Sequence, residues 1–297
     1  FTVQPTFGSL DDNSEVHFQN ESATQFDILG NYTYGKLFVD GVGTGLVRFG
    51  STSLNIIKTA FTVGAGRTLF PLGSSTAWTT LNSGASLIIN GTVRIQKPEG
   101  FVDANVGTPS SSKGSFQFVG TENLTLGASS TIQYDRASNV TNHKISARNY
   151  ANLIISGLDN NKTFVGATSV SGTLTFSTSG TSVLTGTANV TLGDGATLVR
   201  TSGSLLGASP TFGSTVNLSY NGTGPVAQGF EMPANGTVLN NLTISGTTAL
   251  TLNTDVTVNG TLAINAGAVN ITTGTNKLVV ASTAASANIT RTNSGYI

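Results

Sequence analysis

The sequence predicts an all-β protein built as a parallel β-solenoid, and three observations lead to this prediction. Charged residues make up only 9% of the 297 residues, whereas Gly, Ser, Thr and Asn make up almost half. So little Ala, Glu and Lys beside so much Gly and β-branched Thr disfavours helices. Short blocks of sequence also recur at a fixed distance, and apolar residues within them alternate with polar ones, which is the period of a half-buried strand.

The recurring block is about 88 residues long. Its first copy begins with Asn152-Leu153-Ile154-Ile155-Ser156-Gly157 and its second with Asn241-Leu242-Thr243-Ile244-Ser245-Gly246. A Gly-Thr-Leu string follows each copy, at 172–174 and at 260–262, and a segment ending in tyrosine precedes each copy, at Tyr134 and at Tyr220. A partial third echo is found at 90–93. Gly and Asn between the apolar pairs are typical turn residues, because they adopt positive φ at low cost.

Spacing within the second copy indicates how many sides a coil has. Taking every third apolar pair joins Leu242 to Leu262, Leu250 to Val269 and Val256 to Leu278, at separations of 20, 19 and 22 residues. We therefore predict three-sided coils of about 20 residues, stacked in parallel at about 4.8 Å, with these residues as inward ladders. The alternative is an antiparallel β-sandwich array, in which Leu262 would neighbour Val256.

Charge and aromatic content divide the chain. Residues 1–150 hold 10 acidic residues, 10 basic residues and 11 of the 15 Phe. The remainder holds 4 acidic residues, 4 basic residues and 4 Phe. Because end pieces of solenoids depart from the repeat pattern, we expect an N-terminal cap or tip at 1–45. Irregular coils follow at 46–130, with an excursion near 97–113, and regular coils occupy 131–297 and are expected to continue beyond residue 297.

Several strings resemble a known family. Tyr-Ala-Asn-Leu-Ile-Ile-Ser-Gly at 150–157, Leu-Asn-Asn-Leu-Thr-Ile-Ser-Gly at 239–246, the V-x-G-T-L turns at 170–174 and 258–262, and Ile-Ser-Ala-Arg at 145–148 are similar to strand-repeat regions of large adhesin-like proteins of Bacteroidota. The resemblance covers about 120–290. It implies a secreted or cell-surface protein exported by the type IX system, although the chain shows no sorting domain of that system.

Composition excludes some functional classes and weakens others. Formal charge is zero and there is no basic run, which argues against nucleic-acid binding. No apolar stretch is long enough to span a membrane. The carboxylates at Asp135, Asp159, Asp194, Glu231 and Asp255 stand alone in the sequence, whereas polysaccharide chemistry needs them in pairs. His17 and His143 are interpreted as surface or edge histidines, so neither a metal site nor a cofactor is expected.

Fourteen Asn-x-Ser/Thr triplets occur in the chain, and each matches the acceptor pattern for N-linked glycans. The repeat accounts for many of them, because a turn Asn followed by a strand Thr produces the same triplet. We interpret them as turn residues.

Three aromatic residues are the candidate binding residues. Trp78 lies in a polar stretch, and Tyr32 and Tyr34 alternate with Thr33, which places both rings on one side of a strand. Such rings stack on sugars or on protein surfaces, and packing in the core or cap is the competing interpretation.

The favoured hypothesis is a non-catalytic, extracellular structural and adhesive module of a bacterial cell-surface or secreted protein. Its expected partners are extracellular glycans or proteins. One alternative is a carbohydrate-binding or polysaccharide-processing β-helix. The other is a subunit that associates end to end into filaments.

Overall fold

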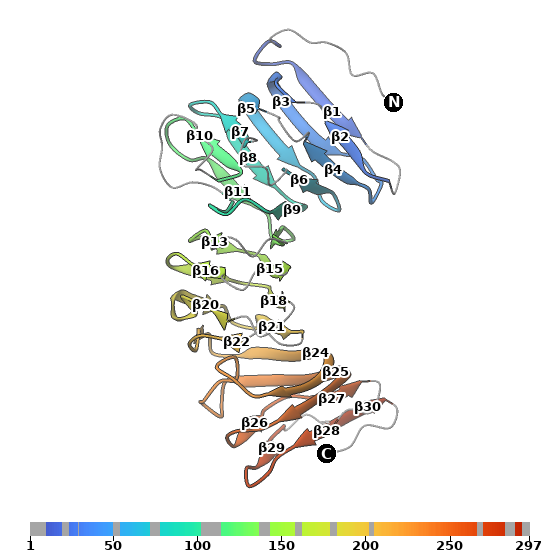
Figure 1. The fold of residues 1–297 in the computed structure, drawn as a ribbon, viewed down its shortest axis with the longest axis vertical. Helices are drawn as coiled ribbons and strands as arrows, with labels where there is room; N and C mark the ends of the chain where they lie inside the picture. Colours follow the sequence, from blue (N-terminus) through green and yellow to red (C-terminus); the bar gives the residue numbers. More distant parts are fainter. Residues whose placement is uncertain are drawn as a thin grey trace. The chain divides into compact units, whose positions relative to one another are not determined.

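The computed structural model describes residues 10–19, 24–28, 30–49, 54–71, 78–101, 114–136, 143–157, 162–178, 183–201, 205–265, 270–282 and 289–292. The fold is an all-β solenoid of parallel sheets, which confirms the predicted class (Figure 1). Its coils average about 23 residues, slightly more than the predicted 20. The chain divides into two compact units, one formed by 1–137 with 143–146 and the other by 138–142 with 147–297.

In the first unit each complete coil contributes one strand to each of three faces. The first face holds the start of β3 (Thr33–Asp40), the start of β5 (Leu54–Val63), β7 (Trp78–Leu81) and β10 (Phe116–Phe118). The second holds β1 (Glu15–Gln19), the ends of β3 and β5, β8 (Ser86–Ile89) and β11 (Leu124–Leu126). The third holds β2 (Phe26–Ile28), β4 (Leu46–Phe49), β6 (Thr68–Phe70), β9 (Thr92–Ile95) and β12 (Thr131–Tyr134). The short strand β13 (His143–Ile145) follows.

Apolar side chains at equivalent positions of successive coils form the core of the first unit. On the third face Val47, Leu69, Val93 and Ile132 are register neighbours in turn, and all four are fully buried. Burying each such side chain contributes roughly 1.5–3 kcal/mol, so an inward column supplies much of the stability of a coil that has no helix to pack against.

One coil of the first unit is much longer than its neighbours. Val93 pairs with Ile132, 39 residues later, whereas Val47 pairs with Leu69, 22 residues later. The long coil contains the segment 97–113, whose residues 102–113 lie outside the described part of the chain. A parallel ladder already begins at Glu15, which pairs with Lys36, within the segment expected to form a cap. The expected divisions at residues 45 and 130 stay predictions.

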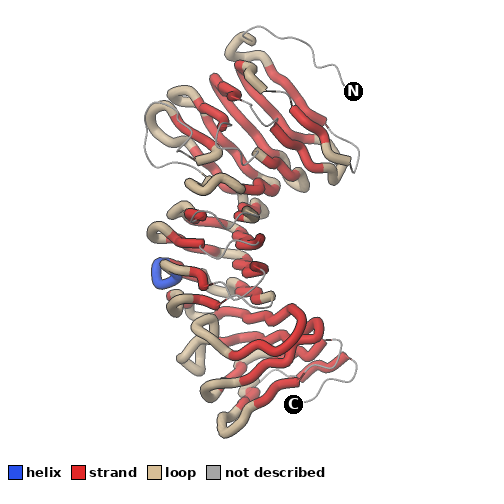
Figure 2. Tube along the Cα trace, in the orientation of Figure 1, coloured by secondary structure: helices blue, strands red, loops and turns tan. Residues whose placement is uncertain are grey.

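The second unit repeats the three-faced plan. One face holds β14 (Asn149–Tyr150), β17 (Thr168–Val170), β20 (Val190–Leu192) and β23 (Thr211–Phe212). Another holds β15 (Asn152–Gly157), β18 (Thr173–Thr178), β21 (Thr197–Arg200), β24 (Val216–Ala227), β25 (Leu239–Thr251), β27 (Leu262–Asn265) and β30 (Ile289–Thr292). The remaining strands are β16 (Lys162–Phe164), β19 (Val183–Leu184), β22 (Leu205–Leu206), β26 (Val256–Val258), β28 (Asn270–Thr272) and β29 (Leu278–Val280). The helix in Figure 2 is the 3-10 turn η1 (Thr187–Asn189).

The register of the second unit decides between solenoid and sandwich. Leu242 pairs with Leu262, and Val256 with Leu278, both in parallel and as predicted. A sandwich would have placed Leu262 beside Val256. The third predicted pair is wrong, because Leu250 pairs with Ile271 rather than with Val269. Residues two apart share a face of a strand, so alternation alone does not distinguish the two registers.

The internal repeat has a structural cause. Its two copies begin in β15 and β25, which are four coils apart in the same sheet. In each copy the Asn side chain accepts a hydrogen bond from a main-chain N–H of the next coil: Asn152 Oδ1 from Thr173 at 3.0 Å, and Asn241 Oδ1 from Thr261 at 2.8 Å. A Cβ on Gly172 would lie 2.6 Å from Asn152 Oδ1, and a Cβ on Gly260 would lie 2.5 Å from Asn241 Oδ1. The position that faces the Asn side chain in the next coil must therefore be glycine.

Candidate functional site

Trp78 is half-buried and lies on the outer side of the first face. It begins β7 and lies in register beside Leu54, which is 41% exposed, whereas the neighbouring residues Asn55 and Ile57 point inward and are buried. Ile56, on the same outer side as Leu54, is 38% exposed. Trp78 therefore belongs to a small outward apolar patch.

The two tyrosines lie elsewhere. Tyr34 is in β3, is 1% exposed and packs in the core, so it is unavailable to a ligand. Tyr32 is half-buried just before β3, and its ring centroid lies 6.2 Å from that of Tyr34 in an edge-to-face arrangement. Core packing, the competing interpretation, holds for Tyr34, because alternate positions of a strand in a closed coil face the interior.

Lys97 was not among the candidate site residues that the sequence indicated. Its side chain is fully buried, and its Nζ lies 5.1 Å from the centroid of the Trp78 ring. Among the described residues none forms a hydrogen bond with that nitrogen, and burial lowers the pKa of Lys97 to about 8, with the charge of Glu99 acting in the opposite direction. A buried ammonium held against an indole face is a cation–π contact, which stabilises the charged form only in part.

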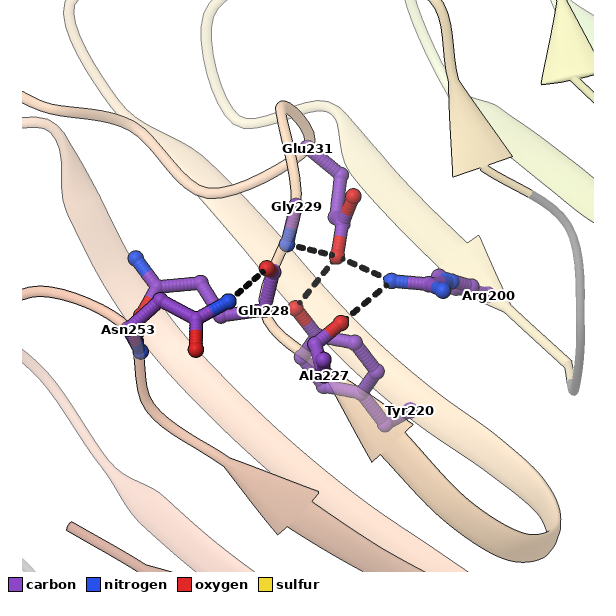
Figure 3. Close-up of polar contacts among 7 residues, drawn as sticks. All are labelled: Arg200, Tyr220, Ala227, Gln228, Gly229, Glu231 and Asn253. Atoms are coloured by element: carbon purple, nitrogen blue, oxygen red, sulfur yellow. Dashed lines mark hydrogen bonds and ion pairs between the residues drawn. The ribbon is translucent and has the colours of Figure 1, made fainter. Parts of the chain in front are cut away.

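A buried polar cluster of the second unit joins Arg200, Tyr220 and Glu231 (Figure 3). Arg200 ends β21 at an inward position, between Phe176 of the preceding coil and Tyr220 of the following one. A guanidinium therefore stands between two aromatic side chains of an inward column. Glu231 reaches it from the turn after β24.

One carboxylate oxygen organises the cluster. Glu231 Oε1 accepts hydrogen bonds from Arg200 Nη1 at 2.6 Å, the Tyr220 hydroxyl at 2.8 Å and the Gly229 main-chain N–H at 3.0 Å. Arg200 Nη1 also donates to the Ala227 carbonyl at 2.9 Å. The side chain of Glu231 is 0% exposed and that of Arg200 is 4% exposed. The cluster thus fixes the turn 228–232 to the interior of the coil.

This arrangement does not match a catalytic dyad. Burial, first, and then the Glu231 carboxylate raise the pKa of Tyr220 well above its usual value, so the phenol stays protonated. Its proton is directed at Glu231 Oε1, which also accepts from Arg200 Nη1 and from the Gly229 main-chain N–H. A group that reacts with a solute must reach it, whereas these groups contact one another inside the coil.

Hydrogen bonds of Gln228 hold the outer part of the same turn. The Gln228 carbonyl accepts from Asn253 Nδ2 at 2.8 Å, and Gln228 Oε1 accepts from the Asn253 main-chain N–H at 2.9 Å (Figure 3). Each hydrogen bond crosses to the next coil. The turn is therefore anchored from the interior by Glu231 and from the exterior by Gln228.

The other carboxylates that stand alone in the sequence also have partners in space. Asp135 pairs with Arg94, Asp194 accepts from the Ser214 main-chain N–H at 2.5 Å, and Asp255 accepts from that of Lys277 at 2.8 Å. Asp159 lies outside the described residues. No group of three or more His, Cys, Asp or Glu in the described part of the chain is arranged to hold a metal ion.

The two histidines differ from each other. His17 is on the edge strand β1, as expected, and its Nδ1 lies 2.6 Å from Asp40 Oδ2. The surface interpretation of His143 is wrong, since it is fully buried in β13 with its ring 5.2 Å from that of Tyr134. Tyr134 is itself an inward residue, and its hydroxyl accepts from the Ser146 main-chain N–H at 3.1 Å.

Several triplet asparagines have structural roles. Asn217 Nδ2 donates to the Gly195 carbonyl at 3.0 Å, Asn241 Nδ2 to Asn217 Oδ1 at 2.8 Å, and Asn259 Nδ2 to the Leu239 carbonyl at 3.0 Å. These amides link one coil to another, which favours their interpretation as turn and ladder residues.

Comparison with known proteins adds no family. The chain matches no family model, no curated protein and no solved structure. Among the described residues, none of the helical segments has the length and hydropathy that a membrane span needs.

Proposed function

We propose that this chain is a non-catalytic structural and adhesive module of a secreted or cell-surface bacterial protein. The observation that carries the proposal is the buried Arg200–Glu231–Tyr220 cluster, whose side chains contact one another and main-chain groups across two successive coils. Such a cluster fixes a turn in place and leaves none of the three side chains directed at a substrate.

The hydrogen bonds between coils favour the same function. Main-chain ladders and the amides of Asn217 and Asn241 link successive coils, while polar side chains at outward positions keep the surface hydrated without strong charge. A stack of this kind transmits load through many parallel hydrogen bonds, since each coil is tied to its neighbours on every face.

Removal of one whole coil tests the structural part of the proposal. Deleting residues 153–173 joins Asn152 to Leu174, the register neighbour of Leu153, so every remaining ladder can pair again. We expect circular dichroism of β type and a cooperative thermal transition. The matched control deletes only 153–163, which puts strands of different faces in register and should abolish that transition. Loss of folding in the whole-coil deletion as well would contradict the proposal.

Assays on a panel of polysaccharides test the non-catalytic part. We expect no depolymerisation by the purified chain. Turnover that disappears in Glu231→Gln, with its folding retained, would refute the proposal and assign an enzyme.

The patch around Trp78 favours a second candidate, a module that binds carbohydrate. The half-buried Trp78 lies beside the exposed residues Leu54 and Ile56, and indole faces stack on sugar rings. A glycan array should then show binding that Trp78→Ala removes. The control is Phe230→Ala, which removes a 54% exposed aromatic side chain of the second unit. Equal loss in both variants, or no binding by the parent, would reject this candidate.

A further inference from the structure

Four Asn–Gly pairs occur in the chain, at 90–91, 221–222, 235–236 and 259–260. Asparagine before glycine is prone to an intramolecular reaction, because glycine has no Cβ to hinder the approach of its nitrogen to the preceding side chain. The glycine nitrogen bonds to the Asn Cγ, the Cγ–Nδ2 bond breaks and ammonia leaves, which gives a cyclic succinimide. Water then opens the ring to aspartate or to isoaspartate.

The fold restrains three of these pairs. The Gly260 N–H donates to the Asn240 carbonyl at 2.6 Å, and Asn259 Nδ2 donates to the Gly236 and Leu239 carbonyls at 2.8 and 3.0 Å. The nucleophile and the leaving group of that pair are thus both held. A backbone fixed in this way reacts only after local opening.

The pairs at 221–222 and 90–91 are held in other ways. The Gly222 N–H lies within β24 and donates to Thr248 Oγ1 at 3.0 Å. Gly91 is buried, and its N–H donates to the Val63 carbonyl at 3.3 Å. Each nitrogen would have to break its hydrogen bond before it could attack.

The pair Asn235–Gly236 is different. Both residues are exposed in the turn between β24 and β25, and no hydrogen bond of the described structure engages the Gly236 N–H. Asn235 Oδ1 instead accepts from the Thr237 main-chain N–H at 3.1 Å and from Thr237 Oγ1 at 2.9 Å. Two donors on this oxygen withdraw electron density from Cγ, which makes that carbon more electrophilic.

We propose that Asn235 is a site of spontaneous deamidation in the folded protein, through the exposed Gly236 nitrogen and the polarised side-chain carbonyl. The aspartate product adds a negative charge to the turn. The isoaspartate product inserts a methylene into the main chain of a turn that the Val238 N–H closes onto the Asn235 carbonyl at 3.2 Å. The modification therefore alters the segment that carries Glu231.

Peptide mapping by mass spectrometry tests the proposal on the intact folded chain, incubated warm at mildly alkaline pH. Asn235 should convert at least about tenfold faster than Asn90, Asn221 and Asn259, because an opening free energy of only ~1.4 kcal/mol gives this protection. In denaturant the four pairs should convert at comparable rates, which separates the effect of the fold from that of the sequence.

Gly236→Ala is the matched variant. An added Cβ would lie 3.4 Å from Thr257 Oγ1, an ordinary contact, so the variant should fold normally. We expect it to slow conversion at Asn235 and leave the thermal transition unchanged. Conversion at Asn259 as fast as at Asn235 in the folded chain, or a rate at Asn235 that Gly236→Ala does not change, would overturn the proposal.

Discussion

The side chain of Asn241 is joined to Thr261, twenty residues later in the next coil, through a 2.8 Å hydrogen bond from the Thr261 main-chain N–H to Asn241 Oδ1. Its Nδ2 meanwhile donates to Asn217 Oδ1 in the preceding coil at 2.8 Å. One amide thus bridges three coils. The same residue type at the start of the other repeat copy, Asn152, makes the equivalent hydrogen bond to Thr173.

Asn241→Ala should lower the free energy of unfolding by about 2 kcal/mol, because it removes both hydrogen bonds and leaves the half-buried Thr261 N–H unpaired. Denaturant unfolding followed by circular dichroism measures the change. Asn221→Ala is the control, since Asn221 is an exposed residue of β24 and belongs to the same kind of triplet. Its effect should stay within about 0.5 kcal/mol. Equal effects in the two variants would contradict the bridging role.

Gly260→Ala should destabilise the fold by roughly 1–3 kcal/mol, since the new methyl group would overpack the corner. Its Cβ would lie 2.5 Å from Asn241 Oδ1 and 2.9 Å from the Asn240 carbonyl oxygen. Thermal unfolding of Gly260→Ala beside Gly236→Ala isolates this contact, because the second variant places its methyl group at 3.4 Å from its nearest neighbour. If Gly260→Ala leaves the thermal stability unchanged, the corner accommodates the methyl group and this prediction is wrong.

Glu231→Ala should cost about 3–5 kcal/mol, because it leaves the buried Arg200 charge uncompensated. Replacing both partners, as in Arg200→Met with Glu231→Met, removes the isolated charge and should be less destabilising than the sum of the two single replacements. A double-mutant cycle by chemical denaturation measures the coupling. Strict additivity would mean that the two groups do not depend on each other.

Lys97→Met should stabilise the protein at pH 7 by on the order of 2 kcal/mol, because the pKa of Lys97 is lowered to about 8 from its usual 10.5. Between those pH values the unfolded chain binds the proton and the folded chain does not. Stability of the parent should therefore rise with pH across this window, and the advantage of the variant should shrink there. Chemical denaturation at pH 7 and at pH 10 compares the two proteins.

Fluorescence of Trp78, the single tryptophan of the chain, gives an independent reading of the same group. The fluorescence of the parent protein should change with a midpoint near pH 8, because the Lys97 ammonium next to the indole loses its charge there. Lys97→Met should abolish that titration. A midpoint that persists in the variant would assign the transition to another group.

Alternation and turn residues were enough to predict the class of fold and the pairs Leu242–Leu262 and Val256–Leu278. They were not enough for the pair of Leu250, because Val269 and Ile271 are two residues apart in the sequence and alternation alone does not distinguish the two registers. For the candidate site, Trp78 could be chosen as an aromatic residue in a polar stretch. Tyr34 could not be rejected, since alternation leaves open which side of a strand faces the core.

The Arg200–Glu231 pair could be predicted from the sequence only in part. Arg200 lies two residues after Leu198 and so shares its side of the strand, and this was the available signal for a buried charge. Its partner lies 31 residues away in an irregular turn, and no periodicity connects the two.

The sequence by itself determined the local chemistry of this protein: short strands from β-branched alternation, corners from Gly and Asn, and a repeat of about 88 residues that marks where Asn and Gly must stack. Only the tertiary structure decided which residues meet. Coil length varies, so the residue above or below a given position depends on how many residues each turn uses. Contacts such as Lys97 with Trp78, and the burial of charge in an apolar column, exist only once the coils are stacked.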